Sequence, residues 1–503
     1  MGEVERFRSV LARRLGLQFD DAKSGFLGDV LRRRLAATHR DCERYLRNLE
    51  GRADQAELGA LAQELTVPET YFFRNIDQFR AFSELVVPER IRTGAGGRRL
   101  RVLSAGCASG EEAYSLAILL RDAVDSSWRT SIRAVDINPA VLEKAQRGRF
   151  STWALRETPP DVQCRWFAEE GRDVVLDDAI REAVQFEWRN LAEDDPDLWQ
   201  PERYDVVFCR NVIMYLTPES SRALVARITR ALAPGGYLFL GHAETLRGLS
   251  QEFHLCHTHG TFYYQRKDSS APAISCGPVG ASQGSAGVEP LATLVDESAT
   301  WVDTIRLATE RVQDLVDAQS ARAAPHEVAA PARARPRWDL GRPLELLREE
   351  RFAAALDLVN ALPPDAADDP DVLLLQAVLL THAGLLSRAE AACRRLLEID
   401  ELSAGAHYLL ALCREGAGDR SGAIDHDRVA IHLDPDFAMP RLHLGLLARR
   451  VGDSETVRLE LGNAVTLLQR EDPSRLLLFG GGFSREALTT LCRAGMDVGG
   501  ETV

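Results

Sequence analysis

Hydrophobic residues recur at helical spacing through residues 1–90, with no alternating run between them. This period is typical of amphipathic helices. From residue 98 to 266, short strand-like runs alternate with helix-like segments. The strand candidates are Leu100–Ser104, Ser131–Asp136, Val184–Trp188, Tyr204–Cys209, Tyr237–Gly241 and Thr261–Gln265. Because helices fit between most of these runs, the segment predicts a mostly parallel, doubly wound sheet.

A third region, from residue 339 to about 472, is helical throughout, and its pattern repeats. Three glycines are spaced 34 residues apart: Gly384, Gly418 and Gly452. Small residues stand seven positions before them: Ala377, Ala411 and Gly445. A 34-residue period with small residues where two helices cross is typical of tetratricopeptide repeats. Residues 343–364 fit a partial first unit, and an ordinary helical bundle is the alternative interpretation.

Residues 267–298 are rich in Ser, Ala, Gly and Pro, which is typical of a flexible linker, and residues 319–337 have linker character again. A lone amphipathic helix is predicted over 301–318. The predicted organisation is an N-terminal helical domain, an α/β domain, this linker, the repeats and a C-terminal tail. Their ranges are 1–90, 91–266, 267–338, 339–472 and 473–503.

Composition narrows the classes of protein to consider. The 503 residues are 45% hydrophobic, which excludes bulk disorder. A net charge of −14 excludes a general attraction to nucleic acid or to an anionic membrane. No apolar run approaches the roughly 18 residues of a membrane span. The nine cysteines are scattered without a CxxC pair. We therefore expect a cytoplasmic protein without a disulfide framework or a metal site.

Small and polar residues follow the predicted strands at one edge of the sheet. Ala105–Gly110 leads from the first strand into a helix, and its small side chains let a ligand approach the backbone. Asp136 ends the second strand, where an acid can accept hydrogen bonds from a ribose, although Asp136 or Asn138 could equally cap the next helix. Arg210 and Asn211 follow the fourth strand. Together they predict a nucleotide-like ligand at this edge.

Several ordered motifs resemble the CheR family of chemotaxis-receptor glutamate O-methyltransferases. They are Thr70-Tyr71-Phe72-Phe73-Arg74, SAGCASGEEAYSLA, AVDIN, RNL, FCRNVIMY and LAPGGYLFLGHAE. The whole chain resembles hybrid members with C-terminal tetratricopeptide (TPR) repeats. The resemblance implies an α/β class I (Rossmann-like) methyltransferase with an N-terminal all-α domain, plus a C-terminal all-α TPR solenoid. It also implies S-adenosyl-L-methionine as the cofactor, S-adenosyl-L-homocysteine as its product, and no metal.

The functional residues of the family carry over to matching positions. Arg74 and Tyr215 are the implied catalytic residues, which position the methyl group and the acceptor. The implied cofactor-binding residues are Thr70, Arg74, Glu112, Asp136, Asn190, Leu191, Arg210 and Asn211. Pro68 stands where some members have a cofactor-contacting Asn, so we expect that contact to be lost or made by backbone. His242 and Glu244 belong to a GHxE element with an expected structural role near the site.

The implied reaction is methylation of glutamate side chains on a methyl-accepting chemotaxis receptor, for signal adaptation. A glutamate has a pKa near ~4.3, so its carboxylate is already a nucleophile at pH 7 and needs no general base. Catalysis is expected from in-line alignment, with Arg74 orienting the carboxylate. Two alternatives remain open, namely a methyltransferase for another acceptor and a non-catalytic cofactor-binding scaffold.

The expected receptor-binding surface is basic. From Lys23 to Arg52 there are eight Lys or Arg residues and four acids, which suits an acidic helical bundle. A solvated helix face is the alternative. The small β-subdomain expected near 164–186 is short, so we expect no tethering by a C-terminal receptor peptide. The repeats are expected to recruit an unidentified protein, and the chain is expected to be monomeric, without nucleic-acid binding or membrane insertion.

Overall fold

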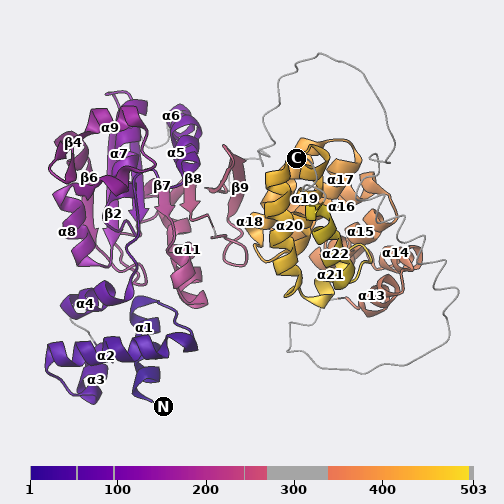
Figure 1. The fold of residues 1–503 in the computed structure, drawn as a ribbon, viewed down its shortest axis with the longest axis horizontal. Coiled ribbons are helices and arrows are strands. Elements are labelled where there is room, and N and C mark those ends of the chain that lie inside the picture. Colours follow the sequence, from indigo (N-terminus) through magenta and orange to yellow (C-terminus); the bar gives the residue numbers. More distant parts are fainter. Residues whose placement is uncertain (1, 52–54, 94–96, 243, 269–337, 498–503) are drawn as a thin grey trace. The chain divides into compact units, whose positions relative to one another are not determined.

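The computed structural model describes residues 2–51, 55–93, 97–242, 244–268 and 338–497. The predicted helix over 301–318 and nearly all of the predicted linker lie outside these residues. The chain divides into two compact units, Met1–Gly277 and Pro278–Val503, and each is described by itself (Figure 1). Among the described residues, every helix falls short of the length and apolar character that a membrane span requires.

The first unit begins with a small helical layer. Its elements are α1 (Glu3–Leu15), η1 (Asp21–Lys23), α2 (Ser24–Thr38), α3 (Cys42–Glu50) and α4 (Gln55–Leu65). Phe7, Tyr45 and Leu58 belong to an apolar core of its own. Asp41 caps α3, since its side chain accepts a hydrogen bond from a backbone N–H in the first turn. These helices confirm the all-α character predicted for the start of the chain.

A seven-stranded sheet forms the centre of the first unit, in the order β6-β2-β1-β7-β8-β10-β9. Its strands are β1 (Arg99–Ala105), β2 (Arg129–Asp136), β6 (Val184–Trp188), β7 (Tyr204–Cys209), β8 (Leu232–Leu240), β9 (Phe253–Thr258) and β10 (Thr261–Arg266). β6 to β8 run parallel, and β10 and β9 follow antiparallel. The main helices of the sheet are α7 (Glu111–Ala123), α8 (Pro139–Arg147) and α11 (Pro218–Ala231). The predicted α/β class is confirmed. Five of the six strand candidates lie wholly in a strand, and the sixth, Tyr237–Gly241, extends one residue beyond β8.

A second, three-stranded sheet lies between β2 and β6 in the sequence, with the order β3-β5-β4. Its elements are β3 (Arg149–Ser151), η3 (Thr152–Leu155), α9 (Pro160–Trp166), β4 (Phe167–Glu170), β5 (Asp173–Leu176) and α10 (Asp178–Arg181). The predicted subdomain near 164–186 therefore begins earlier, because its third strand comes from residues upstream of the predicted range.

The helices just before β1 belong to the sheet and not to the N-terminal layer. They are α5 (Ile76–Ala81), a π-helical turn η2 (Phe82–Val86) and α6 (Val87–Thr93). Phe79 and Phe82 pack against Phe208 of β7, and Arg90 of α6 forms a buried ion pair of 3.0 Å with Asp205. These three elements, which the sequence grouped with the N-terminal helices, therefore pack on the core of the sheet, since helical periodicity does not reveal which core an apolar face joins.

The second unit is helical. Its elements are α13 (Gly341–Arg348), α14 (Phe352–Asn360), η5 (Pro364–Ala366), α15 (Pro370–His382), α16 (Leu386–Ile399), α17 (Ala404–Gly416), α18 (Arg420–Leu433), α19 (Ala438–Arg450), α20 (Ser454–Leu468), α21 (Pro473–Phe479) and α22 (Arg485–Asp497). α15, α17 and α19 start at residues 370, 404 and 438, which keeps the 34-residue period. A Cβ on Gly445 would lie 2.4 Å from a Leu461 methyl group, so this glycine lets α19 and α20 pack closely.

Residues 473–497 form the helices α21 and α22 where the sequence predicts a tail. α22 packs against α20, and α21 contacts α15. Phe479 of α21 places its ring 6.0 Å from that of Tyr408 and 5.1 Å from that of Phe437. This part of the predicted tail therefore belongs to the folded helical array.

A charged network is buried between the paired helices. His443 of α19 is fully buried, with Nδ1 2.6 Å from Asp427 Oδ2 and Nε2 3.1 Å from Glu415 Oε2. Arg450 also pairs with Glu415. Burial by itself lowers the pKa of His443, but the two carboxylates outweigh it and raise the pKa to about 9. His443 is therefore cationic at neutral pH.

We expect the C-terminal unit to lose stability between pH 6.5 and about 9. In the folded protein the pKa of His443 is about 9, above the ordinary histidine value of 6.5. Its contribution to the free energy of unfolding is therefore complete below pH 6.5 and disappears as the pH rises through about 9. Calorimetry of the full chain should show one unfolding transition moving to lower temperature over this range. His443→Gln should flatten that slope, and an unchanged slope in this variant would contradict the assignment.

Candidate active site

Two adjoining cavities lie between the N-terminal helices and the carboxyl ends of the parallel strands. The larger has a volume of about 580 Å³ and the smaller about 200 Å³. Their shared lining is Val67, Gly106, Ala108, Asn211 and Tyr215. They lie where the strand order reverses beside β1, the usual binding crevice of an open α/β sheet. The structure brings all the predicted site residues to these walls: Thr70, Arg74, Glu112, Asp136, Asn190, Leu191, Arg210, Asn211 and Tyr215.

The turn after β1 is drawn tightly against its neighbours. The N–H groups of Gly106 and Cys107 both donate to the carbonyl of Val135, at 2.8 and 3.0 Å. Gly106 has φ 81°, and a Cβ there would lie 2.5 Å from Val212 Cγ2. Glycine is thus needed both for the left-handed backbone and for the close approach of the loop after β7.

Asp136 fixes this turn and also faces the larger cavity. Its Oδ2 accepts from Ala108 N at 2.9 Å and its Oδ1 from Asn138 N at 2.8 Å. Burial raises the pKa of Asp136, and these backbone donors oppose the rise. Asn138, not Asp136, caps α8 by accepting from two backbone N–H groups. Asp136 is therefore free of the capping role and retains lone pairs for a ligand.

The smaller cavity contains a chain of charged groups. Arg210 is buried, donates to the carbonyl of Arg74 at 2.6 Å and lies 3.4 Å from Glu112 Oε2. Glu112 Oε1 accepts from Ser104 at 2.7 Å. Burial raises the pKa of Glu112, which Arg210 opposes, and burial lowers the pKa of Arg210. The side chain of Arg74 donates to the carbonyl of Glu69, so its backbone and its guanidinium are both held.

The loop after β7 is anchored by the buried carboxylate of Glu244. Glu244 accepts from the N–H groups of Asn211 at 2.7 Å, Met214 at 3.2 Å and Gly241 at 2.6 Å. Asn211 has φ 57°, an unfavourable backbone for a residue with a side chain. The sequence placed Glu244 near the site, but not its three backbone partners, because backbone donors leave no trace in a residue pattern.

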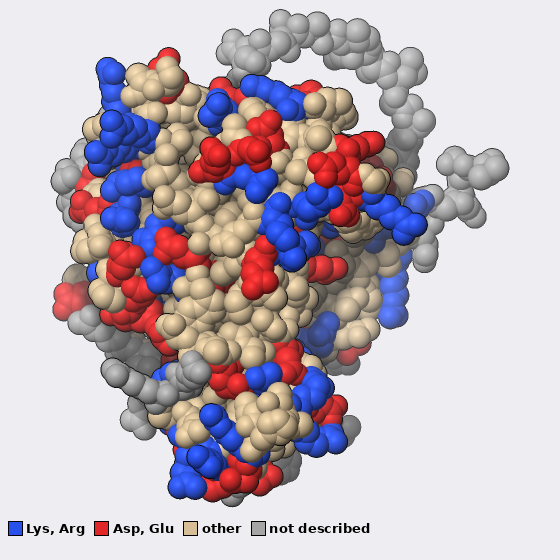
Figure 2. All heavy atoms as spheres, turned by 90° about the vertical axis from the view of Figure 1, so that its left-hand side faces the viewer, with Lys and Arg blue, Asp and Glu red and all other residues tan. Residues whose placement is uncertain are grey.

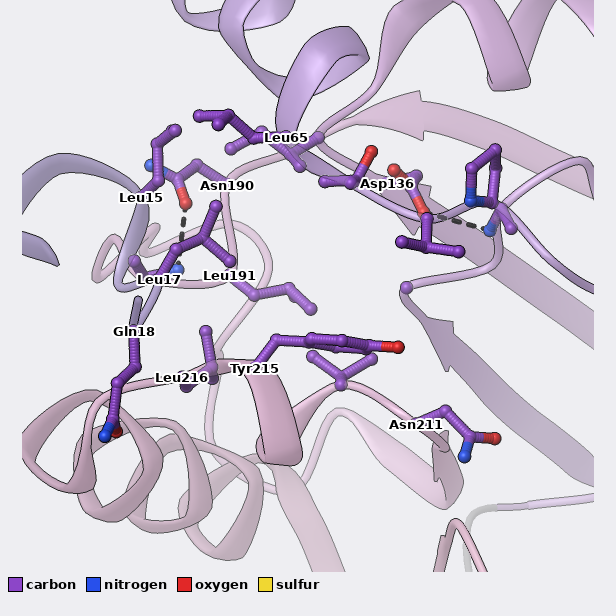
Figure 3. A pocket seen from close by; sticks show the side chains of 18 of the residues that line it. Leu15, Leu17, Gln18, Leu65, Asp136, Asn190, Leu191, Asn211, Tyr215 and Leu216 are labelled. Carbon is purple, nitrogen blue, oxygen red and sulfur yellow. Dashed lines mark hydrogen bonds between the residues drawn. The ribbon is translucent and has the colours of Figure 1, made fainter. Parts of the chain in front are cut away.

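Tyr215 is positioned by the N-terminal layer. Its carbonyl accepts from Gln18 N at 2.8 Å, and Thr217 N donates to Gly16 at 2.8 Å. Leu17 and Leu216 form a β-bridge between these segments. Figure 3 shows the Tyr215 ring extending across the larger cavity towards the side of Asp136. Sequence reasoning missed the residues after α1 that clamp this loop, since they match no motif.

Asn190 and Leu191 form another part of the wall. The amide of Asn190 donates to the carbonyl of Arg14 at 2.8 Å and accepts from Ala192 N at 3.0 Å. Both ends of this amide therefore have protein partners, so it joins α1 to the loop after β6. Leu191 lines the cavity beside Leu17.

Three further residues near the site are Pro68, Thr70 and Cys107. Pro68 lines the larger cavity and Thr70 the smaller one. Cys107 is buried, and burial raises its pKa, which keeps it as a thiol and favours the interpretation as a small filler. Within the described ranges, no three His, Cys, Asp or Glu side chains are grouped to hold a metal ion.

Four arginines of the predicted basic surface, Arg32, Arg33, Arg34 and Arg47, form ion pairs within the N-terminal layer. Arg33 contacts Glu64 and Arg34 contacts Glu57, each at 2.7 Å. Figure 2 shows blue and red side chains interleaved at this lower end of the molecule. From Lys23 to Leu65 there are eight basic and seven acidic residues. The acids of α4 lie beyond Arg52, where the count in the sequence analysis ended. This pairing favours the alternative of a solvated helix face.

Comparisons with known proteins agree with this geometry. Residues 68–262 match the model of the CheR methyltransferase, SAM-binding domain. The chain is 30% identical to the probable biofilm formation methyltransferase WspC of Pseudomonas aeruginosa, over 90% of this chain and 96% of that protein. It is 28% identical to the protein of the same name from Pseudomonas putida, over 89% and 95%. It is 33% identical to chemotaxis protein methyltransferase 2 of Vibrio cholerae, over 50% and 88%.

Glu244→Gln should destabilise the first unit by about 2 kcal/mol, because a charged acceptor of three backbone N–H groups becomes an amide with one acceptor oxygen. Chemical denaturation of the full chain would measure the loss. Glu252→Gln, an exposed acid of the same region, should change stability by less than about 0.5 kcal/mol. Equal stabilities of the two variants would show that Glu244 does not anchor the loop.

Proposed function

Since this chain belongs to the CheR family of S-adenosyl-L-methionine-dependent methyltransferases, we propose that it methylates glutamate side chains on a methyl-accepting chemotaxis receptor. The observation that carries the proposal is the meeting of Arg74, Glu112, Arg210 and Tyr215 around one small cavity. They come from three segments far apart in the sequence, since Arg210 and Tyr215 both belong to the loop after β7. A methyltransferase for another acceptor and a non-catalytic scaffold remain the alternatives to be tested.

The walls of the cavities suit S-adenosyl-L-methionine. The volume of about 580 Å³ is ordinary for a small-molecule site, and Leu17, Leu191 and Leu216 offer apolar surface to a purine. Asp136 offers a carboxylate to ribose hydroxyls. In the smaller cavity, Glu112 and Arg210 match the ammonium and carboxylate of an amino acid. When bound, the cofactor supplies an electrophilic methyl group.

The residues of the chain orient the acceptor and do not activate it. A glutamate carboxylate is ionised at neutral pH, so no general base is required. Arg74 presents its guanidinium at the smaller cavity and orients the attacking carboxylate by charge-assisted hydrogen bonds. Arg74 remains protonated in proteins and cannot serve as a base. Tyr215 lies between the two cavities and limits how the acceptor approaches.

The second unit recruits a partner in this proposal. The helix pairs α15–α16, α17–α18 and α19–α20 keep the 34-residue period and are interpreted as TPR units. Arrays of this kind bind other proteins and usually carry no chemistry of their own. Recruitment through the array would replace tethering by a C-terminal receptor peptide.

Methyl transfer should depend on Arg74. With methyl-tritiated S-adenosyl-L-methionine and receptor-containing membranes, the full chain should label a receptor-sized band, and alkali should release the label as volatile methanol. Arg74→Ala should lower the rate roughly 100-fold or more, because misplaced reactants lose that much.

The control is Arg80→Ala, which removes an exposed arginine of α5 that pairs only with Asp77 among the described residues. It should retain the wild-type rate. Label that resists alkali would indicate another acceptor, and cofactor binding without any label would indicate a scaffold.

Deleting residues 339–503 should weaken receptor labelling at low receptor concentration while leaving cofactor affinity unchanged, because the cavities lie wholly in the first unit. Initial rates over a receptor titration would measure this as a raised KM. Unchanged receptor binding and methylation would show that the array does not perform this recruitment.

A further inference from the structure

Two guanidinium groups share one aromatic ring at the rim of the smaller cavity. The Arg74 guanidinium carbon lies 5.7 Å from the centre of the Tyr71 ring, and that of Arg156 lies 3.5 Å from it. Arg156 also lies 4.7 Å from the Trp153 ring. Since Arg156 directly follows η3, the small-sheet subdomain supplies one of these cations and the segment after α4 the other.

Neither guanidinium has a carboxylate partner in the described part of the chain. Arg74 donates to the carbonyl of Glu69 and Arg156 to that of Trp153, each at 3.0 Å. The nearby carboxylate of Glu157 instead accepts from the Tyr71 hydroxyl at 2.9 Å. Aromatic contacts therefore hold both cations in place, while their remaining donors are available to an anion from outside.

The same rim exposes large apolar side chains. Met214 and Tyr215 of the cavity wall are 56% and 41% exposed, and Trp153, which contacts Arg156, is 72% exposed. Aromatic residues, Met and Arg together are the typical composition of the centre of a protein–protein interface. The rim therefore offers both charge and apolar surface to a polypeptide, and not only to a free carboxylate.

We propose that Arg156 binds a second acidic side chain of the substrate, one helical turn from the glutamate that is methylated. This inference rests on the proposed function, in which Arg74 orients the reacting carboxylate. The two guanidinium carbons are separated by no more than the sum of their distances to the ring that they share. Residues three or four apart on a helix have Cβ atoms about 5–6 Å apart, and their flexible side chains span this separation. The enzyme thereby selects glutamates that lie in acidic helices.

The first test compares kinetic constants of full-length variants. The probe is the cytoplasmic helical fragment of a chemoreceptor that the wild-type enzyme methylates at a mapped glutamate. Arg156→Ala should raise the KM for this fragment roughly three- to tenfold and leave kcat within about twofold, because an exposed charge pair contributes to binding and not to the chemical step. The KM for S-adenosyl-L-methionine should stay unchanged.

Arg165→Ala is the matched control. Arg165 is also exposed and lies 4.6 Å from the ring of a tryptophan, Trp166, but it pairs with Asp122 at 2.8 Å. Its loss should leave both KM values unchanged. An equal rise in this variant would assign the effect to a general disturbance of the subdomain and overturn the role of Arg156.

Charge exchange provides the decisive readout. The acid three or four residues from the methylated glutamate is replaced by Lys in the receptor fragment. Arg156→Glu should methylate this altered fragment with a lower KM than the wild-type enzyme does, because the sign of the pair is reversed. A purely structural role of Arg156 would not produce such rescue.

The outcomes separate this inference from the function on which it rests. If the wild-type enzyme forms alkali-labile esters but Arg156→Ala keeps the wild-type KM, or charge exchange gives no rescue, the role of Arg156 is overturned and the proposed function stands. If the wild-type enzyme forms no methyl ester on any receptor fragment, the proposed function and this inference fall together.

Discussion

The buried guanidinium of Arg210 joins the parts from which the cleft is made. It donates to the carbonyl of Arg74 and lies 3.4 Å from Glu112, so it links the segment after α4, the loop after β7 and the first turn of α7. Burial lowers its pKa, because a charge removed from water is stable only when protein partners compensate it. Losing one partner would leave that charge uncompensated. The segment that carries Arg74 is therefore fixed by the same interaction that fixes the edge of the sheet.

Three residues at the same cleft have strained backbone conformations, and each is held by a hydrogen bond from its N–H to a side chain. Phe73, Ala108 and Asn211 all have positive φ, which is unfavourable for residues with side chains. Each of them donates its N–H to a side-chain oxygen. The acceptors are Ser115, Asp136 and Glu244. A reaction that depends on alignment, and not on proton transfer, needs rigid walls of this kind.

Much of the fold and cleft could be predicted from sequence, because alternating hydrophobic runs mark strands and parallel strands bring their carboxyl ends to one edge. The resemblance to the CheR family, and not this pattern, grouped Glu112 with Arg210, and the structure places the two side chains 3.4 Å apart. Interactions that depend on pairing in space could not be predicted. Glu57 and Glu64 of α4 pair with arginines of α2 that are distant in the sequence, so no local pattern shows the pairing. The partners of Glu244 are backbone groups, which every residue has. Helical periodicity likewise did not assign α5 and α6 to the sheet.

Charge places a further constraint on the proposed recognition of an acidic substrate. A net charge of −14 repels such a partner at long range, but salt confines that repulsion to about 8 Å from the surface. Within that distance only local cations matter. Folding has paired Arg33 and Arg34 with acids, whereas Arg74 and Arg156 keep their donors at the cleft. In the proposed function, recognition would therefore depend on a few guanidinium groups beside the reacting atoms, which would favour selection of one glutamate position over general affinity for acidic surfaces.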